Sequence, residues 1–211
     1  MDFIKEPMAI ENRSMELIAP HLSGLGLDER ATKVYSRIIH ASGDVAYAPI
    51  IRVSPEAIDA AMEALRSGAH IYTDVEMVRT GINKKKLASF GGEVHCLVAD
   101  PDIAVCAKTE GITRSMVAMR RFGKDLNGSI IAIGNAPTAL FEVLRLVHEE
   151  GIRPACIVGI PVGFVGAAES KAELARNGIV PYITVEGTKG GSPIAAAAVN
   201  AMMYLIDNTR P

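Results

Sequence analysis

The sequence predicts an α/β fold in three layers: a mostly parallel five-stranded sheet, helices on both of its faces, and a helical segment at the N-terminus. Two patterns carry this prediction. Residues 1–68 show helical spacing of their apolar side chains, whereas residues 69–211 alternate short apolar runs with amphipathic segments. Repeated strand-then-helix units favour a parallel sheet covered on both faces, so we expect a single domain over residues 1–211.

The helices of the N-terminal part are predicted from their capping residues. Ser14 is expected to cap a first helix, and Asp28 is expected to cap a longer one that ends near Gly43. Residues 54–56, Ser-Pro-Glu, open a third helix with proline at its first position, and Gly68 closes it.

Five apolar runs predict the strands, and an amphipathic segment after each run predicts a helix. The runs lie at residues 69–73, 94–98, 129–133, 155–160 and 182–185. The helices are expected at residues 75–81, 113–122, 137–150, 167–177 and 193–207. A stretch of four alanines, Ala195–Ala198, predicts close helix packing, either against a second subunit or inside one subunit.

The composition predicts a soluble globular protein. Of the 211 residues, 49% are apolar and 22% are charged, and the net charge is −2. This balance argues against nucleic acid as the main partner, because a phosphate-binding surface usually makes a domain basic. The N-terminus lacks the apolar region of a signal peptide, and the apolar runs are too short to span a bilayer. We therefore expect a cytoplasmic protein without a membrane partner.

The cysteines and histidines predict no metal site. The cysteine number is odd and no CxxC pattern occurs, so Cys96, Cys106 and Cys156 are interpreted as buried thiols in a reducing compartment. No two histidines have the helical spacing of metal ligands.

The loops after the last three predicted strands are rich in glycine and predict a binding site. In an open parallel sheet, ligands bind beyond the carboxyl ends of the strands. Residues 134–138, 161–166 and 187–193 each bring backbone N–H groups to a helix N-terminus, which attracts anions, and Arg114 can bind a carboxylate. One such loop is more often a simple turn, but three together favour a ligand with several negative groups. Neither the dinucleotide-binding nor the P-loop glycine pattern occurs.

His40 is a candidate acid. It falls at the predicted carboxyl end of the helix that Asp28 caps, where the partial negative charge favours the imidazolium. A lone histidine is more often structural, so its position alone leaves both roles open. The basic run Lys84–Lys86 is interpreted as a solvated face. Acidic residues near the strand ends could form carboxylate pairs for acid/base work, but they are interpreted as helix caps: Asp74, Glu76, Asp100 and Asp102.

Four strings, together with the Lys189–Ser192 loop and Asn200, resemble the precorrin-8X methylmutase family, which includes the cobalt-precorrin-8 methylmutases. The resemblance covers nearly the whole chain in order, and its last two strings are highly specific. The strings are RIIHASGD at residues 37–44, DVEMV at 74–78, GNAPTAL at 134–140 and PVGFVGAAESK at 161–171.

The resemblance implies an isomerase of cobalamin biosynthesis. Its members move a methyl group from carbon 11 to carbon 12 of precorrin-8 or cobalt-precorrin-8, giving hydrogenobyrinic or cobyrinic acid. It implies that His40 protonates the ring, that the protein is a homodimer, and that no cofactor is needed because the substrate carries its own methyl group. The sequence looks closer to the cobalt-using branch.

The resemblance also implies the substrate contacts. Ser14 matches a family serine that contacts the substrate, and Arg114 matches the arginine near the macrocycle. An apolar bed for the ring is expected from Met77, Phe164 and Val165. Further contacts are expected at Arg13, Arg37, Thr113, Ser115, Asn135, Gly163, Lys189, Gly190, Gly191 and Ser192.

Two other functions stay open from the residues themselves. A tetrapyrrole-binding carrier without turnover would explain the carboxylate-friendly loops. An unrelated α/β enzyme acting on a phosphate ester would use the same helix N-termini, but it leaves the chain-long match unexplained.

Overall fold

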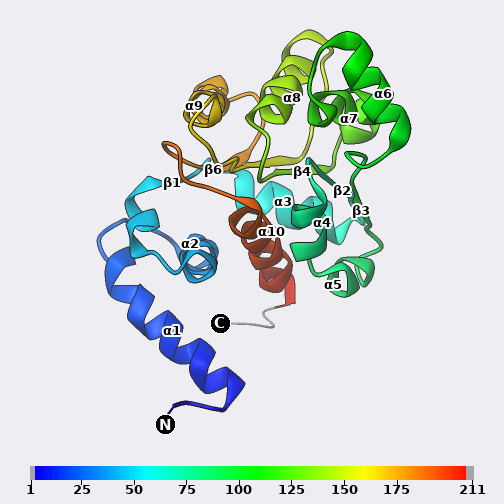
Figure 1. Ribbon diagram of the computed structural model, residues 1–211. Helices are drawn as coiled ribbons and strands as arrows, with labels where there is room; N and C mark the ends of the chain where they lie inside the picture. The colour runs from blue at the N-terminus through cyan, green and yellow to red at the C-terminus, as the bar shows by residue number, and fades with distance from the viewer. Residues whose placement is uncertain (1–2, 208–211) are drawn as a thin grey trace.

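The computed structural model describes residues 3–207, which form a three-layer α/β fold (Figure 1). Within this range the strands are β1 (Ile51–Val53), β2 (Ile71–Thr73), β3 (Val94–His95), β4 (Ile130–Ile133), β5 (Cys156–Gly159) and β6 (Tyr182–Val185). The α-helices are α1 (Pro7–Leu22), α2 (Glu29–Ser42), α3 (Ala57–Arg66), α4 (Glu76–Gly81), α5 (Lys84–Ala88), α6 (Pro101–Glu110), α7 (Arg114–Phe122), α8 (Pro137–Glu149), α9 (Ala167–Asn177) and α10 (Ser192–Asp207). Two 3-10 helices are η1 (Val45–Ile50) and η2 (Gly123–Leu126).

The sheet has the strand order β1-β6-β5-β4-β2-β3. Strands β2 to β6 pair in parallel, which confirms the predicted mostly parallel sheet. The sheet has six strands rather than five, because β1 adds an antiparallel edge strand in which Ile51 lies opposite Val185. This strand was missed because it is three residues long and pairs with a segment more than a hundred residues later in the chain.

Helices cover both faces of the sheet, as predicted. Alternate strand residues point to opposite faces: Ile130 and Ala132 of β4 join the core shared with α2, α3 and α10, whereas Ile131 and Ile133 join the core shared with α7, α8 and α9. Figure 1 shows α10 beneath the sheet, with α8 and α9 above it.

The caps of α2 agree with the sequence prediction, and those of two other N-terminal helices do not. The Asp28 carboxylate accepts the Ala31 N–H at 2.7 Å, and Gly43 ends α2 in the left-handed conformation. Helix α1 starts at Pro7, and the Glu6 side chain caps it instead of Ser14. Helix α3 begins at Ala57, so Pro55 lies in the preceding turn and not at the first helical position.

Two short helices, α5 and α6, lie in segments where no helix was expected. The Asp100 carboxylate caps α6 by accepting the Asp102 N–H, which confirms the prediction that Asp100 is a helix cap. Helix α5 contains the basic run. Lys84 and Lys85 are exposed as expected, but Lys86 is partly buried, where it pairs with Asp207.

The alanines of α10 pack inside the chain. Ala195, Ala196 and Ala198 are buried, and a side chain at Gly81 of α4 would come within 2.8 Å of the Ala196 Cβ. Packing against a second subunit would need this surface to be free. These alanines therefore serve the contact of α10 with its own subunit.

The cysteines are free thiols, but only Cys156 is fully buried. Cys96 and Cys106 are half-buried, which corrects the expectation that all three are core residues. No helix among residues 3–207 has the length and apolar character to cross a bilayer.

Candidate active site

The loops that follow β5 and β6 lie together at the carboxyl edge of the sheet. The Gly163 N–H donates to the Thr188 carbonyl at 3.2 Å, and the Gly191 N–H donates to the Ile160 carbonyl at 2.9 Å. A Cβ at Gly190 would lie 2.5 Å from the Ile160 oxygen, so only glycine allows this approach. The structure therefore brings together five of the predicted contact residues: Gly163, Lys189, Gly190, Gly191 and Ser192.

The carboxyl end of α2 meets the β6–α10 loop. Asp44 caps η1 through the Ala46 N–H and forms an ion pair with Lys189. The hydrogen bond from Lys189 lowers the pKa of Asp44 below its ordinary value. The Tyr47 ring centroid lies 5.3 Å from the Lys189 Nζ, and its hydroxyl lies 3.5 Å from the Gly190 carbonyl oxygen. Burial raises the pKa of Tyr47, so this hydroxyl stays protonated.

These elements border an open cleft of about 420 Å³. Its lining includes Ser42, Asp44, Tyr47, Val162, Lys189 and Gly190. His40 directly precedes the first lining residue, Ala41, and its side chain is exposed in the last turn of α2. The imidazole itself is not among the lining residues, but its exposure leaves it free to exchange protons.

Asp74 takes up the backbone donors of the third glycine loop. Its buried carboxylate accepts the N–H groups of Gly134, Asn135 and Ala136 at 3.0, 2.8 and 2.7 Å. Burial raises the pKa of Asp74, while the three hydrogen bonds oppose that effect. The expectation that this loop offers free N–H groups to a ligand is therefore wrong. Asn135 remains exposed, but it does not cap α8.

Arg114 lies at the start of α7, where its side chain is exposed. Thr113 caps that helix by accepting the Met116 N–H, and its hydroxyl lies 2.9 Å from that of Thr138 in the first turn of α8. Among residues 3–207 Arg114 has no ion-pair partner, so its guanidinium is available to a ligand. Ser115 is buried, with 7% of its surface exposed, and does not face solvent.

The predicted contacts in the N-terminal helices lie on α1 and α2 and are not among the lining residues of the cleft. Arg37 pairs with Glu11 and so links α2 to α1. Arg13 pairs with Glu16 at 2.9 Å on an exposed surface, and the Ser14 hydroxyl donates to the Ile10 carbonyl within its own helix. None of these three residues is in the lining of the cleft, and Figure 1 shows α1, which carries Arg13 and Ser14, projecting from the body of the molecule.

Large apolar side chains project from the loop between β5 and α9. Phe164 is 94% exposed and Val165 is 89% exposed, far beyond what a folded core residue shows. Met77, the third residue of the expected apolar bed, is 65% exposed at the start of α4. Exposed apolar side chains beside a cleft are typical of a surface that covers an apolar ligand or a partner.

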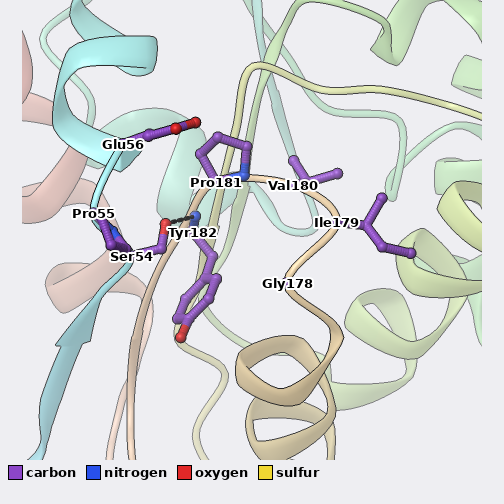
Figure 2. A pocket seen from close by; sticks show the side chains of 8 residues that line it. All are labelled: Ser54, Pro55, Glu56, Gly178, Ile179, Val180, Pro181 and Tyr182. Carbon is purple, nitrogen blue, oxygen red and sulfur yellow. Dashed lines mark hydrogen bonds between the residues drawn. The ribbon is translucent and has the colours of Figure 1, made fainter.

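A second hollow, of about 240 Å³, lies at the opposite edge of the sheet, where β6 begins (Figure 2). The Ser54 hydroxyl there accepts the Tyr182 N–H at 2.9 Å, and Glu56 is the charged residue of the lining. Ligands of parallel sheets bind at the carboxyl edge, and the basic residues lie there too, so we assign the site to the cleft beside α2. Among the described residues, no cluster of side chains could bind a metal ion.

Of the predicted contact residues, Lys189 and Gly190 line the cleft, whereas no role was predicted for Ser42, Tyr47 or Val162 of the lining. Sequence reasoning also did not find how Asp74 and Lys171 support this region. Asp74 and Lys171 both lie in the matched strings, which was the available signal, yet their partners at residues 134–136 and 189 are distant in the sequence.

The sequence profile of the precorrin-8X methylmutase family matches residues 9–205. A cobalt-precorrin-8 methylmutase of Priestia megaterium is 41% identical over 203 residues, which cover 96% of this chain and 90% of that protein. A precorrin-8X methylmutase of a Sinorhizobium species is also 41% identical, over 95% of this chain and 96% of its own.

The fold is similar to that of a solved structure as well. A precorrin-8X methyl mutase from Thermus thermophilus superimposes with a TM-score of 0.86 and 35% sequence identity. The superposition covers 95% of this chain and 97% of the other, so the N-terminal helices and the sheet are both shared.

Proposed function

Because the chain belongs to the precorrin-8X methylmutase family, an isomerase family of cobalamin biosynthesis, we propose that its cleft moves a methyl group from carbon 11 to carbon 12 of precorrin-8 or cobalt-precorrin-8. The observation that carries this proposal is the exposed His40 at the end of α2, beside the cleft that the two glycine loops form.

His40 acts as the acid in this proposal. A protonated imidazole donates its proton to the macrocycle, which places positive charge beside the carbon that receives the methyl group. The carbon 11–methyl bond then breaks as the carbon 12–methyl bond forms, and the macrocycle returns the proton to the neutral imidazole of His40. All atoms stay within the substrate, so the reaction needs no added cofactor.

In this proposal basic side chains bind the carboxylates of the macrocycle. Arg114 is exposed at the start of α7 and unpaired within the described chain, and Lys189 lines the cleft, where it pairs with Asp44. The N-terminus of α9 has no side-chain cap, so its first N–H groups are available to an anion. Phe164 and Val165 cover the apolar body of the ring in this arrangement.

The conversion itself tests this function. We expect the protein to turn over precorrin-8 or its cobalt form, with a change in the visible spectrum. The two substrates must be offered separately, because sequence identity does not choose between them. A relative named for the cobalt form and one named for precorrin-8X are both 41% identical to this chain. Tight binding of the product without conversion of either substrate would instead favour a carrier that passes the product on.

The chain is proposed to act as one methylmutase domain in the cytoplasm. The family match at residues 9–205 includes both the helical part and the βα units. The free cysteines suit a reducing compartment.

A homodimer is proposed, with α1 at the interface. Met8, Ile10 and Leu17 of this helix are 46%, 45% and 57% exposed, and Phe3 before it is 63% exposed. Such a set of apolar side chains on one projecting helix is typical of a surface that a partner covers. A partner's α1 would also bring a second copy of Arg13 and Ser14 near a cleft, which would explain why these contacts lie apart within one chain.

Leu17→Glu is expected to convert the dimer into a monomer, because it places a charge in an apolar interface. Sedimentation at micromolar concentration measures the change. Val105→Glu is the matched control, because Val105 is 65% exposed on α6 and should leave the dimer intact. A monomeric wild-type protein would contradict the proposal.

A further inference from the structure

Lys171 is a buried cation without an acidic partner. Its side chain lies on α9 with 1% of the residue exposed, and no carboxylate among residues 3–207 pairs with it. Lysine is almost never fully buried unless it is paired. Burial lowers the pKa of Lys171 to about 8, which reflects the cost of keeping the ammonium away from water.

The acceptor of Lys171 is the backbone carbonyl of a residue that lines the cleft. Its Nζ donates to the carbonyl of Lys189, whose own side chain pairs with Asp44 on the opposite side of the loop. Lys189 is therefore fixed from two directions: its main chain is bound by α9, and its side chain is bound at the end of α2.

The orientation of this carbonyl also sets the direction of the next N–H. In a trans peptide the C=O and the following N–H point in opposite directions, and the described chain contains no cis peptide. The Lys189 carbonyl points toward α9, so the Gly190 N–H points away from it. Gly190 lines the cleft beside Asp44 and Tyr47.

The Gly190 N–H has no acceptor among the described residues, although its neighbour Gly191 donates to Ile160. Gly190 has a φ of 153°, and at a glycine the backbone can rotate with little steric resistance. Without the bond from Lys171, the Lys189–Gly190 peptide could therefore rotate and turn this donor out of the cleft.

We propose that Lys171 is a positioning residue, which fixes the Lys189–Gly190 peptide so that the Gly190 N–H donates to a carboxylate of the bound substrate. The inference rests on the proposed function, because it takes the ligand of the cleft to be a polycarboxylate. It explains why α9 retains a buried ammonium where an apolar residue would pack at no electrostatic cost.

The test is Lys171→Met, which has similar volume and no charge. Product affinity is measured by visible absorption, turnover is measured by conversion, and stability is measured by thermal unfolding. We expect the affinity to fall by about ten- to a hundredfold, as for the loss of a hydrogen bond to a charged group. The melting temperature should stay the same or rise. Lys108→Met, at an exposed position on α6, is the control and should change neither quantity.

A purely structural role would lower the melting temperature together with the affinity, and that result would overturn the proposal. Affinity within twofold of the wild type would also overturn it. A wild-type protein that neither binds nor converts a corrin precursor would overturn the proposed function as well, so the two failures are distinguishable.

A second measurement uses the wild-type protein alone. A Lys–Gly pair occurs once in the sequence, at residues 189–190, so labelling lysine carbonyls with ¹³C and glycine nitrogens with ¹⁵N selects one amide signal. On addition of the corrin product, this amide proton should shift downfield and become protected from exchange. An unchanged signal in a saturated sample would overturn the proposal.

Discussion

Replacing His40 by alanine is expected to slow methyl transfer by roughly a hundred- to ten-thousand-fold, the usual contribution of a positioned acid. Affinity for the product should change little, because the imidazole is exposed at the end of α2 and the cleft lining begins at the next residue. Single-turnover conversion, followed by the visible spectrum, measures the rate, and a titration with product measures binding.

His21→Ala provides the matched control. His21 is likewise exposed and lies in the last turn of α1, so both variants remove an imidazole from a comparable place on a helix. Only the His40 variant should lose turnover. A His40→Ala protein that converts its substrate at the wild-type rate would show that another group supplies the proton.

The sequence predicted the features whose cause is local. Asp28 and Gly43 define the ends of α2 because a cap acts within three or four residues. The strands β4 and β5 are short runs of apolar residues buried on both faces, which is the pattern of a central parallel strand. The glycine loops after β5 and β6 were found for the same reason, since their positions follow from the strands.

The features that depend on distant residues were not predicted. Serine caps helices more often than glutamate does. However, α1 begins at Pro7, so Ser14 lies inside the helix and Glu6 occupies the capping position. The N–H groups at residues 134–136 look free in the sequence, and only the fold shows that Asp74 accepts them from 60 or more positions away. The placement of Arg13 and Ser14 apart from the cleft likewise depends on how α1 leaves the body of the molecule.

Asp74 is expected to contribute most to stability among the residues at the carboxyl edge of the sheet. Asp74→Ala would leave the N–H groups of Gly134, Asn135 and Ala136 without their acceptor. An unpaired buried donor costs about 1–3 kcal/mol, and the Asn135 and Ala136 donors are only part-buried, so a total loss of roughly 3–6 kcal/mol is expected. Domains of this kind are stable by about 5–15 kcal/mol, and the loss is therefore a large part of the whole.

Urea unfolding measures this loss, and two further variants show its origin. Asp74→Asn keeps one acceptor oxygen, so it should lie between the wild type and Asp74→Ala. Asp100→Ala removes an exposed carboxylate that caps α6 through one N–H, and it should cost only about 1 kcal/mol. If Asp74→Ala were no more destabilising than Asp100→Ala, the hydrogen bonds from residues 134–136 to Asp74 would not be what stabilises the loop between β4 and α8. The ordering of the three variants follows from the number of buried N–H groups that each one leaves unpaired.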